Sequence, residues 1–218
     1  GQSQVYYLSG YTPTKISSQQ FDAVLASYAG LEAVTGFAFM DRGHPMLQLN
    51  FPGEEKSWRF DATTKDWFEV AYDVTEGRHR ANLQIEFLNR TLVADYDNGN
   101  IYILDPDSYT DNGTYIAREL RGRHIFNKSD RMIVNELCLD FETGVGLQSG
   151  QGSDPQAMLQ ISKDNGHTWG NELWTTMGAA GKYLTRVRWH RLGIAFDWVF
   201  KIRVTDPVKF AMTFAALK

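Results

Sequence analysis

The sequence predicts an almost all-β fold built from propeller-type blades, and three observations support this class. Aromatic and β-branched residues dominate the chain, and turn residues interrupt them at short intervals. Hairpins in which an aspartate closes the first strand recur, the first two roughly 35 residues apart. Units of roughly 40 residues with such hairpins are typical of propeller blades. The pattern favours a propeller, and it leaves a β-sandwich with Asp-Gly hairpins open as the alternative.

Short strands follow one another along the chain, with a single short helix near its start. We expect the helix over residues 18–29, because Ser17 or Ser18 can cap it and Gly30 can end it. Its apolar face carries Phe21, Val24, Leu25 and Tyr28. The predicted strands cover residues 3–8, 33–40, 44–50, 56–61, 66–72, 81–88, 91–96, 100–104, 114–120, 131–141, 156–162, 171–176, 183–191, 198–205 and 208–217.

Three stretches share the plan of a strand, an Asp-led turn and a second strand. They are WRFDATTKDWFEV at 58–70, VADYDNGNIYIL at 93–104 and SKDNGHTW at 162–169. The DYDNG segment at 95–99 also looks like the start of a calcium loop, but Pro106 occupies the position where such a loop needs a glutamate. We therefore expect a tight Asn-Gly hairpin at 95–99.

The chain changes character after about residue 125. We expect propeller-type blades and the short helix in residues 1–125, and a longer-stranded C-terminal β-sheet region in residues 126–218. A strand is predicted almost directly after Gly1, so we expect the chain to begin inside a longer protein. The blades of residues 1–125 would then form part of a ring.

The stretch 162–169 has a structural purpose for each of its conspicuous residues. The Asp164 carboxylate can accept hydrogen bonds from turn amides, and Gly166 can adopt a positive φ without steric cost. The hydroxyl groups of Ser162 and Thr168 can bond locally, and Trp169 can cover the base of the turn. We therefore interpret the stretch as a structural brace that does no chemistry.

Basic residues concentrate near the C-terminus, in a chain whose formal net charge is −4. Alternation along residues 183–191 and 198–205 places cationic side chains on one face of each predicted strand. If these two strands pair, one sheet face is apolar and the other basic. That face is either simply solvated or contacts an acidic partner or DNA phosphates. The candidate contact residues are Arg186, Arg188, His190, Lys201 and Arg203.

Signals for enzymatic, metal and cofactor sites are absent from the sequence. The five histidines are not spaced as zinc ligands, and Cys138 has no second cysteine to pair with. The sequence contains no nucleophile elbow, no phosphate-binding loop and no dinucleotide fingerprint. No apolar run reaches the length of a membrane-spanning helix. We expect no catalytic residue, no metal, no cofactor and no membrane span.

Two resemblances to known proteins extend this interpretation. The stretch 162–169 resembles the Asp-box, a hairpin brace of sialidase-type and related propellers. The run from SKDNGHTW at 162 to VKFAM at 212, including RVRWHRLG at 186–193 and FKIRV at 200–204, resembles the C-terminal part of the tail-hub proteins of short-tailed phages. These are also called tail accessory factors or packaged-DNA stabilisation proteins. The early stretch QVYYLSGYTPTKISSQQFDAVLASY at 4–28 is similar to another segment of that family.

The resemblance to tail-hub proteins implies a structural role in the virion tail, after synthesis in the bacterial host cytoplasm. It implies a homo-oligomeric ring that closes the portal channel, retains packaged DNA and docks other tail proteins. The implied partners are the portal–adaptor, the needle and the tailspikes, with possible contact to the packaged DNA.

The alternative function is a sialidase-like propeller that binds or cleaves glycans, since the tryptophans could stack against sugars. The Arg-Ile/Leu-Pro signature of sialidases is absent, and no spacing singles out a catalytic carboxylate pair. We therefore favour tryptophans that fill the cores of the sheets. They are Trp58, Trp67, Trp169, Trp174, Trp189 and Trp198.

Overall fold

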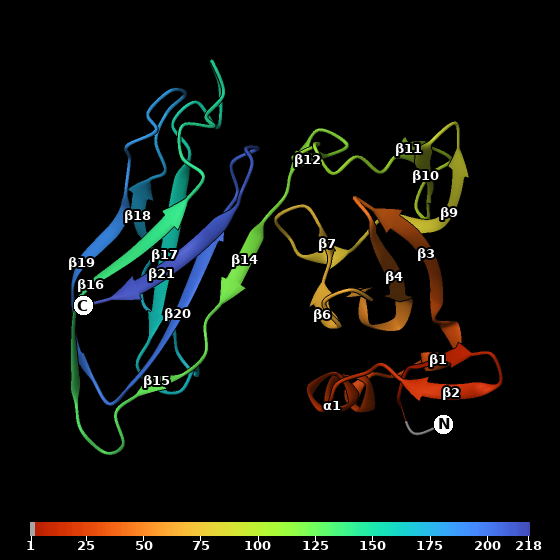
Figure 1. The fold of residues 1–218 in the computed structure, drawn as a ribbon, viewed down its shortest axis with the longest axis horizontal. Coiled ribbons are helices and arrows are strands. Elements are labelled where there is room, and N and C mark those ends of the chain that lie inside the picture. Colours follow the sequence, from red (N-terminus) through yellow and green to blue (C-terminus); the bar gives the residue numbers. More distant parts are fainter. Residues whose placement is uncertain (1–2) are drawn as a thin grey trace. The chain divides into compact units, whose positions relative to one another are not determined.

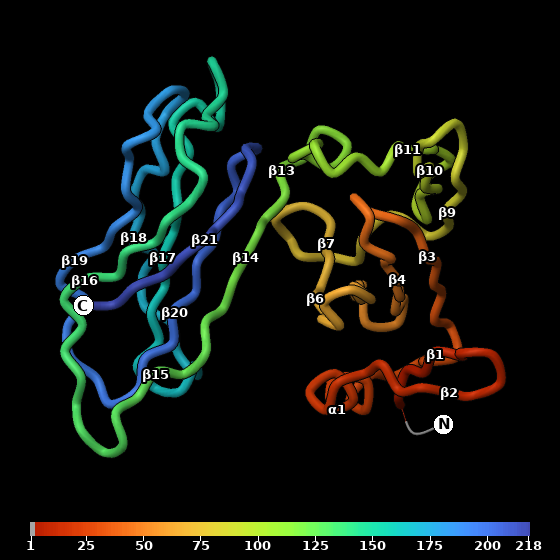
Figure 2. The backbone as a smooth tube through the Cα atoms, in the orientation of Figure 1, coloured from red at the N-terminus to blue at the C-terminus, as the bar shows by residue number. Residues whose placement is uncertain are grey.

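The computed structural model describes residues 3–218, and the chain divides into two compact units, Gly1–Ser108 and Tyr109–Lys218. Antiparallel strands dominate both units, and the described residues contain one α-helix (Figure 1). The predicted all-β class with one short helix is therefore confirmed. Figure 2 follows the backbone with colours that run from red near the N-terminus to blue at the C-terminus.

The first unit consists of small antiparallel sheets and the helix. A hairpin of β1 (Tyr6–Ser9) and β2 (Thr12–Lys15) precedes α1 (Gln19–Ser27), and 3-10 turns lie at Leu31–Ala33 and Pro52–Glu54. A four-stranded sheet contains β3 (Thr35–Asp41), β4 (His44–Phe51), β5 (Lys56–Asp61) and β6 (Asp66–Glu69), in that order. The short pair β7 (Ala71–Tyr72) and β8 (Gly77–Arg78) leads to a three-stranded sheet of β9 (Ala81–Phe87), β10 (Arg90–Asp95) and β11 (Ile101–Ile103) with β10 in the centre.

Helix α1 packs against the four-stranded sheet through aromatic contacts. The Ser18 hydroxyl caps the helix by accepting a hydrogen bond from the amide of Phe21, at 3.2 Å. Phe21 is buried, and its ring stacks on Trp67 with 4.1 Å between ring centroids. The helix ends at Ser27, earlier than predicted, because Tyr28 is already in an extended conformation.

The second unit contains two larger sheets after a short hairpin of β12 (Thr110–Asp111) and β13 (Thr114–Tyr115). One sheet has the order β14 (Arg118–Arg121), β20 (Asp197–Val204), β17 (Gln156–Ser162), β18 (Leu173–Thr176), and β15 (Ile125–Phe126) also pairs with β20. We call it the β17 sheet. The other has the order β19 (Val187–Ala195), β16 (Met132–Phe141), β21 (Met212–Leu217), and we call it the β16 sheet.

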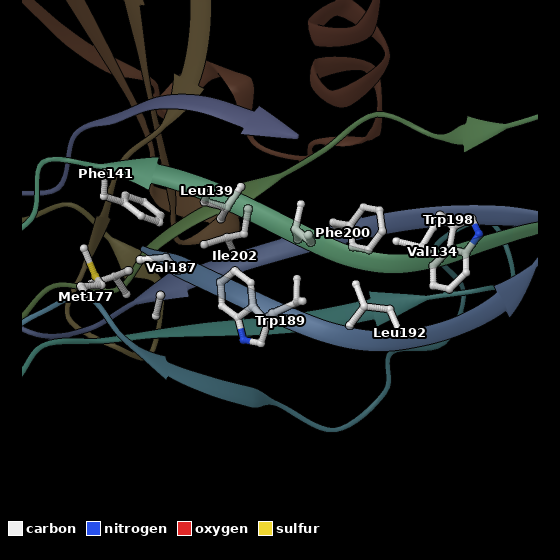
Figure 3. Close-up of a cluster of buried hydrophobic side chains, with 14 of the residues drawn as sticks. Val134, Leu139, Phe141, Met177, Val187, Trp189, Leu192, Trp198, Phe200 and Ile202 are labelled. Atoms are coloured by element: carbon white, nitrogen blue, oxygen red, sulfur yellow. The ribbon is translucent and has the colours of Figure 1, made fainter. Parts of the chain in front are cut away.

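One hydrophobic core joins the β16 sheet to the β17 sheet. Leu139 and Trp189 come from the first, Leu159 and Ile202 from the second, and all four belong to a single buried cluster. Figure 3 shows Leu139 and Trp189 close to Ile202 within this cluster. Two sheets that pack their apolar faces together form a β-sandwich, so the apolar alternation of these strands determines which side of each sheet is inside.

Two expectations from the sequence differ from the structure. The chain divides after Ser108, before the predicted boundary near residue 126, because β14 pairs with β20 and so belongs to the second unit. The condition that strands 183–191 and 198–205 pair with each other is not met, because β19 pairs with β16, whereas β20 pairs with β14, β15 and β17. Each of the two strands has one apolar face, and both faces are buried in the core because the strands lie in opposite sheets of the sandwich.

Candidate functional site

The Asp164 turn lies between β17 and β18 and is held together by its own side chains. The Asp164 carboxylate accepts hydrogen bonds from the Thr168 amide at 2.9 Å, from the Thr168 hydroxyl at 2.6 Å and from the Ser162 hydroxyl at 2.7 Å. The Ser162 oxygen, which is buried, accepts in turn from the Gly166 amide at 2.8 Å. The hydroxyl and amide of Thr168, with Ser162, hold the pKa of Asp164 well below its usual range.

The backbone of this turn uses two consecutive left-handed residues, Asn165 at φ +60° and Gly166 at φ +84°. A Cβ on residue 166 would meet the far end of the exposed Arg121 side chain, which can move aside, so the positive φ is what favours glycine here. Glycine at position 166 therefore supplies the left-handed backbone that the turn needs.

Trp169 connects the turn to the outer face of the β17 sheet. The Lys201 amino nitrogen lies 4.6 Å from the centroid of the Trp169 ring, and the Arg121 guanidinium carbon lies 5.3 Å from it. Arg121 and Lys201 are cross-strand partners in β14 and β20, and Lys201 also lies 3.8 Å from the Glu119 carboxylate. The indole is thus held by cation–π contacts to two neighbouring strands.

The predicted basic residues fall into two groups on different sheets. Arg188 and His190 lie on β19, on the side opposite the buried Val187 and Trp189, and exposed Arg186 directly precedes this strand. His190 Nδ1 lies 3.4 Å from the Glu136 carboxylate of β16. We call Arg186, Arg188 and His190 the β19 group.

Lys201 and Arg203 lie on β20, on the side opposite the buried Phe200 and Ile202. We call this pair the β20 group. Because the two sheets pack through their apolar faces, the β19 and β20 groups project away from each other. One continuous basic face, as suggested by the sequence, is therefore not formed.

The predicted basic face did not include two residues that lie on the same sheet as the β20 group. Arg121 directly contacts Trp169, and alternation in the RELR segment of β14 was the available signal. Trp174 of β18 is 59% exposed and is aligned with Met158, whose other neighbour is Arg203. The outer face of the β17 sheet therefore combines cations with an exposed indole.

The tryptophans that a glycan site would need are mostly engaged in packing. In the first unit, a cavity of about 300 Å³ is bordered by Phe21, Trp58 and Trp67 together with Ser18 and Asp66. The Trp58 indole N–H donates to the Tyr28 hydroxyl at 3.1 Å, and that of Trp67 donates to a backbone carbonyl at 2.9 Å. The ring and the N–H of Trp67 both have protein partners, so neither is presented to a sugar.

Residues 3–218 contain neither a candidate metal site nor a candidate membrane-spanning helix. No group of three or more His, Cys, Asp or Glu side chains there is placed to hold a metal ion. No helix in the same range is long and apolar enough to cross a membrane. The arrangement around Asp164 supplies internal hydrogen bonds to a carboxylate and offers no paired acid and base.

Comparisons with known proteins cover both halves of the chain. Residues 1–109 match the family model described as bacteriophage P22 Gp10, beta-propeller. Residues 117–218 match the model described as bacteriophage P22 Gp10, beta-sandwich. No curated protein matches the chain. The sandwich description agrees with the two sheets of the second unit, and the propeller description agrees with the predicted fold of the first part. Since the two models together span nearly the whole sequence, the chain belongs to the bacteriophage P22 Gp10 family of phage stabilisation proteins.

Proposed function

We propose that this phage structural protein is a tail component that closes the portal channel, retains the packaged DNA and docks other tail proteins. The observation that carries the proposal is the match of both halves of the chain to models of one phage stabilisation family. Its partners are the portal–adaptor, needle and tailspike proteins, and its copies form a ring in the virion tail. The chain is made in the host cytoplasm and has no enzymatic role.

In this proposal the Asp164 turn acts as an Asp-box-type brace. The support is that each oxygen of Asp164 accepts hydrogen bonds from within the turn. A carboxylate with internal donors stabilises the connection between β17 and β18, and Trp169 links it to β20 and β14. Together they stiffen one surface of the sandwich for contact with another tail protein.

The two basic groups belong to the proposal as separate contact surfaces. The β20 group is accompanied by Arg121 and Trp174 on the outer face of the β17 sheet. Cations beside an exposed aromatic ring suit an acidic protein surface or DNA phosphates. The β19 group lies on the other sheet, so it meets a different neighbour.

Reconstitution of the tail tests the proposed function. The protein is mixed with the portal–adaptor complex, and electron microscopy is used to look for a ring below the adaptor. We expect ring formation at low and moderate salt. A failure to associate at any salt concentration contradicts the proposal, and turnover of a fluorogenic sialoside by the purified protein would favour the glycan alternative.

Charge reversal separates the contact surfaces from one another. Arg186→Glu with Arg188→Glu alters the β19 group, Arg203→Glu alters the β20 group, and Lys128→Glu reverses an exposed charge elsewhere as the matched control. We expect the reversal of each group to weaken binding to a different partner and to reduce the salt dependence of that binding. The melting temperature should change little. Equal losses of melting temperature and of binding would show that the cations are only structural.

A further inference from the structure

The triplet Asp-Asn-Gly occurs three times in the chain, each time in a turn between antiparallel strands. The triplets are residues 97–99, 111–113 and 164–166. An asparagine that precedes glycine loses its side-chain amide readily, because glycine has no side chain to shield its backbone nitrogen. The sequence ranks the three asparagines equally, so any difference in their reactivity must come from the structure around each turn.

The reaction joins the backbone nitrogen of the glycine to the Cγ atom of the asparagine. The glycine nitrogen gives its proton to water and attacks Cγ, and the bond from Cγ to the side-chain nitrogen breaks. That nitrogen takes up a proton from water and leaves as ammonia. Water then opens the cyclic imide at either carbonyl and produces aspartate or isoaspartate. The reaction therefore needs a side chain that is free to rotate and a glycine amide that is free of hydrogen-bond acceptors.

The Asn98 side chain is held at both of its polar atoms. Its Nδ2 donates to an Asp95 carboxylate oxygen at 3.0 Å, and its Oδ1 accepts from the Asn100 amide at 2.8 Å. The side chain of Asp95 is 0% exposed, so this anchor is shielded from water. Loss of Nδ2 breaks the first bond, and rotation of Cγ toward the Gly99 nitrogen breaks the second. Deamidation at Asn98 is therefore slowed by two hydrogen bonds.

At the Asn165 triplet the attacking nitrogen is the group that is held. The Gly166 amide donates to the buried Ser162 hydroxyl at 2.8 Å. The Asp164 carboxylate accepts from the Thr168 amide at 2.9 Å and keeps the turn closed around this bond. The Gly166 nitrogen cannot lose its proton or approach Cγ of Asn165 until its bond to Ser162 is broken.

Neither restraint is present at the Asn112 triplet. Asn112 at φ +48° and Gly113 at φ +80° form the turn between β12 and β13, which are aligned at two pairs of residues. Both residues are exposed, and within residues 3–218 neither the Asn112 side chain nor the Gly113 amide makes a hydrogen bond. A Cβ on Gly113 would also meet open space. A hairpin with so few paired residues opens easily, so the Asn112 side chain can reach the Gly113 nitrogen.

We propose that Asn112 is the site of spontaneous deamidation in this protein, and that hydrogen bonds protect Asn98 and Asn165. The product gains one negative charge, and its isoaspartate form has a main chain that is one carbon atom longer. A two-residue turn cannot absorb the extra atom, so the alignment of Asp111 with Thr114 is lost in that form. The modified stretch lies at the start of the second unit, between the segments that the two family models match. This inference does not depend on the proposed role in the tail.

Ageing of the purified protein tests the proposal. The folded chain is incubated at mildly alkaline pH and digested at acidic pH, where the reaction is slow. Mass spectrometry with electron-transfer fragmentation then measures aspartate and isoaspartate at each triplet. We expect Asn112 to react roughly tenfold faster than Asn98 or Asn165, which is the factor that one hydrogen bond supplies. The same chain unfolded in urea is the control, and its three triplets should react at similar rates.

A variant isolates the hydrogen bond at one protected triplet. Ser162→Ala removes the acceptor of the Gly166 amide, so it should raise the rate at Asn165 and leave the rate at Asn98 unchanged. An unchanged rate at Asn165 in this variant would overturn the protection of that triplet. If the variant unfolds the second unit, the rates at Asn112 and Asn165 rise together, and the folded wild-type protein alone decides.

Two results with the folded wild-type protein overturn the proposal. One is a rate at Asn98 or Asn165 that equals or exceeds the rate at Asn112. The other is an intact Asn112 after a time in which the urea control has reacted at all three triplets, because it shows that the β12–β13 hairpin stays closed.

Discussion

The histidine at position 79 makes the stability of the first unit depend on pH between neutrality and pH 3. His79 Nδ1 lies 3.2 Å from the Ala81 amide and 3.2 Å from the Gln48 side-chain nitrogen. Both of these groups donate, so Nδ1 must accept and the ring must stay neutral. Burial and the nearby positive charge of Arg59 lower the pKa of His79 to about 3, and Asp95 opposes this effect.

The size of the effect follows from the difference between the folded and unfolded pKa values. In the unfolded chain the pKa is about 6.5, so below that pH the unfolded state binds a proton that the folded state refuses. The free energy of unfolding is therefore highest above pH 6.5 and falls by about 1.4 kcal/mol per pH unit until the pH approaches 3. At pH 5 the first unit should be about 2 kcal/mol less stable than at pH 7.5.

His79→Asn isolates this contribution, because the asparagine carbonyl can accept in place of Nδ1 and does not titrate. Urea unfolding is measured at pH 5 and pH 7.5, with a short hydrogen-exchange pulse at one fixed pH and mass spectrometry of peptides from β4 and β5. For those peptides, the difference in the free energy of unfolding between pH 7.5 and pH 5 should be about 2 kcal/mol smaller in the variant than in the wild type. Peptides from β17 and β20 serve as the internal reference and should not change. Equal pH dependence in the variant and the wild type would refute the reasoning.

Further predictions concern the Asp164 turn and use urea unfolding of the second unit. Ser162→Ala should cost about 1–3 kcal/mol, because it leaves the Gly166 amide without its acceptor; an unchanged midpoint contradicts this. Gly166→Ala should cost the roughly 1–2 kcal/mol of its left-handed φ, because the exposed Arg121 side chain that the new Cβ meets can move aside. Gly150→Ala is the matched control, with φ +77° and open space; a clearly larger loss at residue 166 would contradict this. The lowered pKa of Asp164 stabilises the fold above about pH 4, and this contribution is lost on further acidification. Asp164→Asn should therefore flatten the acid limb of the stability profile, and an unaltered limb would disprove the linkage.

Local features of the fold were predictable from the sequence because short-range chemistry determines them. A cap at Ser17 or Ser18 was predicted from their position before an amphipathic run, and in the structure Ser18 is the cap. The strands β4, β5 and β17 begin and end within about a residue of their predicted limits. Strand β2 was not predicted, because it contains Pro13 and proline is unfavourable inside a strand.

Long-range partners could not be predicted, because alternation defines the two faces of a strand and not its neighbours. The predicted strand at 183–191 begins only at Val187 and continues to Ala195, past the left-handed residue Arg191 at φ +59°. Its partner β16 and the partner of β20 are far away along the chain. For the candidate site, the Asp164 contacts follow from the local sequence, whereas the separation of the β19 group from the β20 group depends on this sheet assignment.

The three Asp-led turns show why a turn motif is weak evidence for a particular β architecture. Asp61 accepts from the Thr63 amide at 2.7 Å, and Asp95 accepts from the Asp97 amide at 2.8 Å, both within the part that matches a propeller. Asp164 accepts from its own turn in the same manner, yet it lies in the part that matches a sandwich. A carboxylate at a strand end needs only nearby amides, which any antiparallel connection supplies. The architecture is decided instead by long-range pairing, because β17 pairs with β18, which follows the turn, and also with β20, which lies much farther along the chain.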